Sequence, residues 1–434
     1  MSSEAEAILI LVGFLSLLVA GLHIALAIAI PATAYLVIDG GFSALNSLGF
    51  LSWGSMNSET LTAVPLFILM AELLLASGLS NRVYAGMDIL IGRLPGGLLQ
   101  TNIAGCAIFS SVSGSSIATA ATIGRIALPQ LEKRNYDPAL SAGSLAAGGT
   151  LGILIPPSIA LIIYSTFTNT SVPKLFLASL VPGLLLVALY MGYIALRSWM
   201  HPNKEVAPQT DRPTRQDYVR AIADVAPFVL LIGGTLGSLY AGIATTTEAA
   251  TIGCVIALVM GLARRALGLR KLLAALENAA WLSVNILFIV LAAFIFSSAT
   301  SFSGINTMVS SYIISLDLSR DQFFIAVFLL FTVMGMLVES IGMLVITVPL
   351  LYPILAPLGI DPLMFGVIVV LFLELAQITP PMGINLFVIQ GMWNGKFSDV
   401  VRGVIPFALI IFLLAGLIVI WPDIALWLPA KFSG

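Results

Sequence analysis

The chain has 434 residues, of which 59% are hydrophobic and 9% are charged, and its formal net charge is −2. A soluble globular domain carries roughly 25% charged residues. This composition therefore excludes an ordinary soluble fold and indicates that lipid covers much of the exterior. Two cysteines and two histidines offer almost no material for a metal or catalytic cluster, and the sequence contains no HExxH, GxSxG or Walker motif. An internal ATPase is excluded, and an enzyme is disfavoured.

Long apolar segments predict an all-α, polytopic membrane protein. They approach or exceed the ~20 residues that a helix needs to cross a bilayer, and examples are 5–38, 175–196, 225–241, 279–299 and 405–420. The first segment has no basic leader and no cleavage site, so we expect a permanent membrane segment and not a signal peptide. Cys106 and Cys254 lie in apolar stretches and are predicted to fill the core.

Several proline, Asp-Pro and serine positions repeat along the chain at a constant offset of 224 residues. The matched pairs are Pro129 and Pro353, Asp137-Pro138 and Asp361-Pro362, Pro156-Pro157 and Pro380-Pro381, Pro182 and Pro406, and Ser116 and Ser340. Five features in one register, without a gap, predict an internal duplication. The predicted divisions are a first repeat at 1–198, a polar linker at 199–224, a second repeat at 225–424 and a tail at 425–434.

Each repeat is predicted to contain the same elements in the same order. Two helices come first (5–38 and 227–262), followed by a third (59–77 and 279–301) and a shorter polar-flanked stretch (80–93 and 304–317). Then come an apolar stretch broken near its middle (99–130 and 323–354), a helix interrupted by Pro-Pro (139–169 and 363–393) and a final helix (173–198 and 397–422).

The broken stretch could cross the membrane once, or it could enter and return as a helical hairpin. In the first repeat residues 110–116 read SSVSGSS, and six hydroxylic or glycine residues in seven positions form a poor helix centre. We therefore expect re-entrant hairpins at about 99–130 and 323–354. Each repeat then crosses the membrane five times, and an odd number of crossings inverts the second repeat relative to the first.

Basic residues provide a test of this topology. It places fifteen Lys and Arg residues on the side of the linker and three, Lys174, Arg320 and Lys431, on the other side. Arg125 lies within the first hairpin. Because Lys and Arg concentrate in cytoplasmic segments, the linker is predicted to be cytoplasmic and both termini periplasmic.

The paired Pro-Pro breaks mark a candidate transport site. Two consecutive prolines remove backbone donors in mid-span, and irregular backbone persists at that depth only where protein or a water-filled cavity surrounds it. Freed carbonyls can coordinate a cation, and the N-termini of half-helices favour an anion. A Pro-Pro pair could instead simply kink a helix, but two breaks at equivalent places in two repeats favour a transport site.

Hydroxyl and carbonyl oxygens, without a His or Cys cluster, suit Na⁺ better than a transition metal. The residues predicted to bind Na⁺, mostly through main-chain carbonyls, are Ser110, Ser113, Gly114, Ser115, Gly152, Ile155, Pro157, Gly335, Ser340, Ala376, Thr379 and Met382. The residues predicted to contact an anionic substrate are Ser116, Arg125, Pro156, Pro380, Pro381 and Asn385.

Four charged residues could serve function or structure. Glu339 and Glu374 lie at membrane depth, where an acid either serves function or ties helices together. Arg125 could meet an anionic substrate, pair with an acid or snorkel to the membrane edge. Glu248 follows Thr245 at the spacing of a capping box, which predicts a structural role.

Six segments together resemble the large membrane subunit (DctM or SiaM type) of tripartite ATP-independent periplasmic (TRAP) transporters. They are AVPLFILMAELLLASGLS (63–80), IGRLPGGL (91–98), SVSGSSIATAATIG (111–124), GGTLGILIPPS (148–158), GIATTTEAA (242–250) and ITPPMGINLFVI (378–389). The resemblance covers nearly the whole chain and implies an elevator mechanism, in which hairpins and broken helices move against a scaffold. It also implies coupling to Na⁺, with no organic cofactor.

The resemblance further implies location in the bacterial inner membrane and a small organic anion, typically a carboxylate, as substrate. The implied partners are a small four-helix membrane subunit and a periplasmic substrate-binding protein, with no role for nucleic acid. Three positions depart from the family pattern. Thr246 replaces a common proline, Ala376 a frequent glycine, and Arg125 a small or polar residue.

Three other functions fit the sequence less well. A stand-alone divalent-anion/Na⁺ symporter of similar architecture is disfavoured because the Ser-rich tip at 110–116 contains no Asn. An intramembrane enzyme lacks a His-containing or paired-Asp catalytic set, and the two registered breaks would weaken a purely structural subunit.

Overall fold

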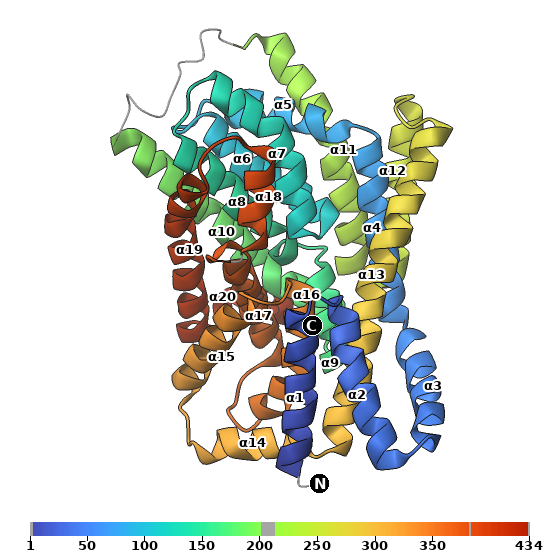
Figure 1. Ribbon diagram of the computed structural model, residues 1–434. Coiled ribbons are helices and arrows are strands. Elements are labelled where there is room, and N and C mark those ends of the chain that lie inside the picture. Colours follow the sequence, from blue (N-terminus) through green and yellow to red (C-terminus); the bar gives the residue numbers. More distant parts are fainter. Residues whose placement is uncertain (1–2, 201–212, 382, 433–434) are drawn as a thin grey trace.

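The computed structural model describes residues 3–200, 213–381 and 383–432, and every regular element in these ranges is an α-helix (Figure 1). Seven helical segments are long and apolar enough to cross a membrane: Glu59–Ala76, Pro138–Thr168, Val172–Met200, Arg215–Tyr240, Thr246–Ala263, Leu269–Phe302 and Phe397–Ile420. The other predicted crossings fall on shorter apolar helices. The prediction of an all-α chain with several membrane spans is confirmed.

The helices of the first half include every element predicted there, and α3 in addition. They are α1 (Ser3–Val19), α2 (Ile24–Gly40), α3 (Ser43–Met56), α4 (Glu59–Ala76), α5 (Leu79–Ile91), α6 (Leu98–Ser113), α7 (Ser116–Lys133), α8 (Pro138–Leu154), α9 (Ile159–Thr168) and α10 (Val172–Met200).

The second half adds α20, which occupies the predicted tail. Its helices are α11 (Arg215–Tyr240), α12 (Thr246–Ala263), α13 (Leu269–Phe302), α14 (Ile305–Ser315), α15 (Arg320–Met334), α16 (Ser340–Leu355), α17 (Pro362–Ile378), α18 (Ile384–Met392), α19 (Phe397–Ile420) and α20 (Asp423–Lys431).

Several helix bounds recur at the offset of 224 residues, most clearly for α8 and α17. Both helices begin with proline behind an aspartate cap. Asp137 Oδ1 accepts from the Leu140 N–H at 2.8 Å, and Asp361 Oδ1 accepts from the Leu363 N–H at 2.7 Å. Proline at the first position removes a donor that would lack a helical partner, and the aspartate satisfies another. The same local signal therefore starts the same helix in both halves.

Two capping boxes define the starts of α11 and α12. At α12, Thr245 Oγ1 accepts from the Glu248 N–H at 3.3 Å and Glu248 Oε2 accepts from the Thr245 N–H at 2.8 Å, so the predicted structural role of Glu248 is confirmed. Thr214 and Asp217 form the same motif at α11. Residues 215–224, predicted as linker, are therefore helical, whereas 201–212 lie outside the described residues.

The helices pack as two groups, which α5 and α14 join and which also meet directly where α4 contacts α6 and α9 and where α13 contacts α16 (Figure 1). The α4 group comprises α1–α4 and α11–α13, and the α8 group comprises α6–α10 and α15–α20. Helix α5 packs on α11 and α6, and α14 packs on α13 and α16, so each contacts both groups. The start of α1 lies at one end of the molecule, and the ends of α10 and α11 that flank 201–212 lie toward the other.

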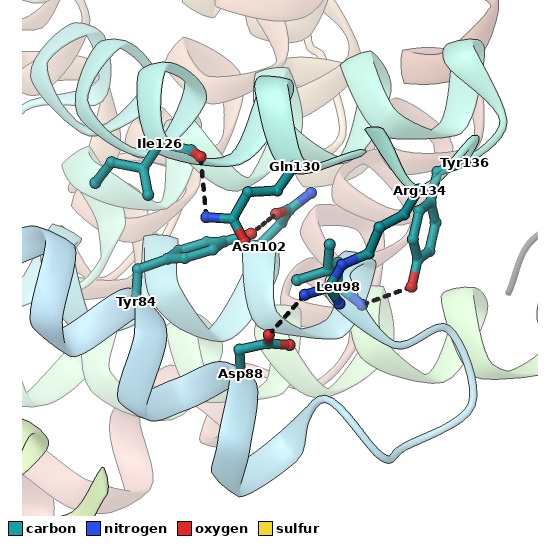
Figure 2. Close-up of polar contacts among 8 residues, drawn as sticks. All are labelled: Tyr84, Asp88, Leu98, Asn102, Ile126, Gln130, Arg134 and Tyr136. Carbon is teal, nitrogen blue, oxygen red and sulfur yellow. Dashed lines mark hydrogen bonds and ion pairs between the residues drawn. The ribbon is translucent and has the colours of Figure 1, made fainter. Parts of the chain in front are cut away.

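Polar contacts hold α5 to the base of the α6–α7 pair in the α8 group (Figure 2). The Tyr84 hydroxyl donates to Asn102 Oδ1 at 2.7 Å, and Arg134 pairs with Asp88 at 3.5 Å. Burial raises the pKa of the Asp88 carboxyl, and the Arg134 guanidinium opposes this change. These contacts position α6 and α7 relative to α5.

Within the α8 group, α8 and α19 cross at two glycines. A Cβ atom at Gly403 would lie 1.7 Å from the Ala139 carbonyl oxygen, and one at Gly143 would lie 2.2 Å from the Gly403 backbone. Small residues allow such close approach between membrane helices, where van der Waals packing is a main source of attraction. The crossing therefore depends on the absence of both side chains.

We expect Gly403→Ala to destabilise the protein by at least the ~1–3 kcal/mol typical of an overpacked core. The added methyl group would overlap the α8 backbone. Thermal unfolding in detergent would measure the effect. Gly416→Ala is the matched control, because a Cβ on that residue of α19 meets no atom within 4 Å. Equal midpoints for the two variants would contradict the predicted crossing.

Candidate functional site

The first break lies where α6 ends and α7 begins. Gly114 joins them with a left-handed backbone at φ 59° and donates its N–H to the Ser110 carbonyl at 3.0 Å. A Cβ atom at Gly114 would lie 2.7 Å from the Pro157 carbonyl oxygen. Glycine is required here both for the backbone angle and for the close approach, so the tip of the α6–α7 pair rests on the first Pro-Pro break.

Hydroxyl groups tie this tip together internally. Ser113 Oγ and Thr119 Oγ1 lie 2.8 Å apart, and Thr119 Oγ1 donates to the Ser115 carbonyl at 2.8 Å. Both side chains are buried. Thr119 was not predicted as a site residue. The sequence did contain a signal for it: Thr119 lies four residues after Ser115, in the first turns of α7.

The Pro156-Pro157 break separates α8 from α9. A Cβ atom at Gly152 would lie 2.5 Å from the Ser115 carbonyl oxygen, so α8 touches the hairpin tip just before it breaks. Ser158 Oγ donates to the Ile153 carbonyl at 2.5 Å and accepts from the Leu161 N–H at 3.3 Å, which bridges the two half-helices. The first set of predicted Na⁺ ligands therefore lies in one place.

The second break brings together the corresponding residues of the second half. A Cβ atom at Gly335 would lie 2.4 Å from Ala376 Cβ, and Thr379 Oγ1 donates to the Leu375 carbonyl at 2.6 Å. Gln377, which was not singled out from the sequence, donates to Ser340 Oγ. Met382 lies outside the described residues.

The arms of the two predicted hairpins pack differently. Helices α6 and α7 pack against each other and on α8. Helix α15 packs on α17, whereas α16 packs mainly on α9, α13 and α17. The second pair is therefore held mainly by its neighbours.

A cavity of about 520 Å³ lies between the two helix groups and reaches both breaks. We call it the central cavity. On the side of the α8 group its polar lining residues are Ser113, Ser115, Ser116, Glu339, Ser340 and Gln377. On the side of the α4 group they are His23, Glu72 and Asn285. Its volume is within the ~300–1,000 Å³ typical of small-molecule sites.

Only one of the six predicted substrate contacts, Ser116, lines the central cavity. Asn385 is fully buried and donates to Ser116 Oγ at 2.7 Å and to the Ala146 carbonyl at 3.2 Å. It therefore joins the second broken helix to the first half. Arg125 lines an adjoining cavity, and the prolines at 156, 380 and 381 are absent from the lining of both cavities.

The two deep acids differ in their surroundings. Glu339 lines the central cavity at the start of α16. Glu374 is fully buried, and within the described part of the chain neither of its carboxylate oxygens has a hydrogen-bond partner. Because no such partner is found, the structure gives no support to the interpretation of Glu374 as a residue that ties helices together.

Comparisons with known proteins agree with this architecture. The family model that matches residues 11–424 is described as the DctM component of tripartite ATP-independent periplasmic transporters. The chain is 31% identical to the C4-dicarboxylate TRAP transporter large permease protein DctM of Vibrio cholerae, covering 97% of this chain and 96% of that protein. It is 29% identical to the sialic acid TRAP transporter large permease protein SiaM of that organism, covering 97% and 98%.

A solved structure resembles the fold. The crystal structure of the Alcanivorax borkumensis YdaH transporter matches with a TM-score of 0.63 over 89% of this chain and 90% of that chain. The sequence identity is 14%, so this likeness supports the fold alone.

The Asn385–Ser116 contact can be tested with a double-mutant cycle. We expect Asn385→Ala and Ser116→Ala each to lower the free energy of unfolding, and the double variant to lose less than the sum of the two. A coupling of about 1 kcal/mol is typical of such a hydrogen bond. Thermal or denaturant unfolding in detergent would measure it, and strictly additive losses would exclude the contact.

Proposed function

The chain belongs to the family of DctM components of tripartite ATP-independent periplasmic transporters, and from this premise we propose that it carries a small organic anion into the cell, driven by Na⁺. Proteins of this family are transporter permease subunits, so the chain is a multi-pass membrane transport protein and not an enzyme. The coupling ion, the substrate class and the mechanism are the proposed parts.

The central cavity is the observation that carries the proposal. It lies between the two helix groups and is reached by the tips of both broken stretches, at Ser115 and Ser340. A site lined by interrupted helices from two repeats, near mid-membrane, is the usual arrangement of a secondary transporter. The cavity is therefore assigned to the substrate and the breaks to the coupling ions.

Oxygen atoms at the breaks support Na⁺ as the ion. Ser113, Ser115 and Thr119 place hydroxyl and carbonyl oxygens at the first tip, beside the carbonyl of Pro157. Ser340 and Thr379 place hydroxyl groups at the second break. Within the described residues no three His, Cys, Asp or Glu side chains cluster as metal ligands, and hard oxygen ligands favour ions such as Na⁺ over transition metals.

We assign the α8 group as the mobile body of an elevator and the α4 group as its scaffold. Helices α5 and α14, which contact both groups, would be the connecting arms. The proposed repeats at 1–198 and 225–424 have inverted topology, with re-entrant hairpins formed by α6–α7 and α15–α16. The excess of basic residues on the linker side supports a cytoplasmic location for that side. We therefore propose an inner-membrane protein with both termini in the periplasm.

The proposed substrate is a carboxylate, and two partners complete the transporter. The similar proteins from Vibrio cholerae are described for C4-dicarboxylates and sialic acid, and both ligand classes are organic anions. The word tripartite in the family description supports two further components. We propose a small membrane subunit and a periplasmic binding protein that delivers the substrate.

Coupling to Na⁺ can be tested by measuring transport. The chain, its small membrane subunit and its binding protein should take up solute in proteoliposomes when an inward Na⁺ gradient is imposed. Replacing Na⁺ with K⁺ should abolish uptake, because the larger ion fits the oxygen sites poorly. Radiolabelled solute that co-purifies with the binding protein is the probe. Equal uptake in K⁺ would refute Na⁺ coupling and leave the permease assignment intact.

The role of the second broken helix can be tested by removing its two prolines. Replacing Pro380 and Pro381 together with alanine restores two backbone donors, so α17 and α18 could join into one helix. Uptake should fall at least tenfold while membrane insertion is retained. Pro406→Ala, which alters a proline within the continuous helix α19, should retain most uptake. Normal uptake by the double variant would remove the break from the proposed site.

A further inference from the structure

A second cavity of about 590 Å³ adjoins the central one. Glu72, Leu75 and Ala121 line both cavities, so the two are neighbours along the boundary between the helix groups. The other lining residues come from the end of α4, the turn that follows it and the start of α5, from α7 and from the start of α13. The second cavity thus lies toward the end of the molecule where α5 is found (Figure 1).

Two cationic side chains line the second cavity from opposite groups. Arg125 belongs to α7 of the α8 group, and Lys271 belongs to α13 of the α4 group. Both residues are exposed. Within the described residues neither forms an ion pair, and Lys271 Nζ donates to the Ala266 carbonyl at 3.1 Å. Arg125 therefore pairs with no acid among the described residues, and it does not line the central cavity.

One acid also lines the second cavity. Glu72 Oε2 accepts from Asn278 Nδ2 at 3.3 Å and forms no ion pair within the described residues. Two cations against one acid leave the cavity with a formal surplus of one positive charge. Like charges in a concave, partly low-dielectric site focus the potential and raise the local concentration of an anion.

We propose that the second cavity is a binding site for carboxylate anions, through which the transported anion passes between the central cavity and the linker side. The guanidinium of Arg125 offers paired donors to a carboxylate, and the ammonium of Lys271 adds a point charge. The amide groups of Asn81 and Asn278 line the same space. The identity of the anion rests on the proposed function, whereas attraction of anions is a property of the cavity itself.

The two cations also make this site dependent on conformation. In the proposed elevator, Arg125 moves with the α6–α7 pair while Lys271 stays with the scaffold. The pair would then face one cavity only when the mobile body has the position found in this structure. The site binds the anion in that position and is dismantled when the body moves away.

A charged-reagent assay tests the proposal without requiring transport. Ala274, an exposed residue that lines the cavity on α13, is replaced by cysteine in a chain whose Cys106 and Cys254 are alanine. The rates of modification by anionic methanethiosulfonate ethylsulfonate and by its cationic trimethylammonium analogue are compared in detergent. We expect the ratio of the anionic to the cationic modification rate to be about tenfold higher than the same ratio for a free thiol. Succinate should slow modification by the anionic reagent.

Glutamine substitutions then test whether Arg125 and Lys271 cause the preference for the anionic reagent. Arg125→Gln and Lys271→Gln should each reduce the anionic preference severalfold and weaken protection by succinate. Arg265→Gln is the matched control: it removes an exposed charge near the start of α13 that does not line the cavity, and the preference should persist.

Three results would overturn the proposal. They are the absence of an anionic preference, a preference unchanged by either glutamine substitution, and protection by phosphatidylglycerol but not by succinate. The last result would identify a lipid headgroup site. Because no Na⁺ gradient and no partner protein is used, the outcome is independent of whether Na⁺-driven uptake occurs.

Discussion

Irregular backbone at membrane depth is the constraint on which the rest of this structure depends. Lipid cannot hydrogen-bond to a broken helix, so each break must be enclosed by protein. At the first break, the α6–α7 tip provides this enclosure. The tip at Gly114 rests on the carbonyl of Pro157, and Gly152 brings α8 against Ser115. Hydroxyl groups such as Ser158 Oγ then bridge the half-helices. The first break and the α6–α7 tip therefore form one mutually dependent unit.

Small residues make that enclosure possible beyond the breaks themselves. Helices α8 and α19 approach through Gly143 and Gly403, and α8 and α7 approach through Gly149, whose Cβ would lie 2.6 Å from Ala120 Cβ. Such packing gives the α8 group a dense interior, while the central cavity lies at its boundary with the α4 group. A boundary that carries the cavities and is linked by α5 and α14 is where relative motion would alter access. The densely packed α8 group could therefore move as one body, and the boundary with the α4 group could change during the proposed motion.

Charge is distributed sparingly around this boundary. The central cavity is lined by Glu72 and Glu339 together with hydroxyl and amide groups, whereas Arg125 and Lys271 lie in the second cavity. Cations placed beside the central cavity can attract an anion without binding it tightly at the site itself. Binding that is strong enough to enter and weak enough to leave is a general requirement for passage through a membrane protein. In the proposed path, the position of the two cations outside the central cavity would meet that requirement.

The sequence alone determined the class of protein, the breaks and some helix starts, such as those of α8, α12 and α17, because these depend on local chemistry: apolar length, aspartate-proline caps, a capping box and consecutive prolines. It did not identify α3, or the start of α11 within the predicted linker. Only the tertiary structure decided which polar residues meet. Asn385, predicted to contact substrate, bonds Ser116, 269 residues away, and Gln377 enters the site through Ser340, 37 residues away. Whether a side chain faces a cavity or another helix depends on the packing of distant segments, which a linear pattern does not encode.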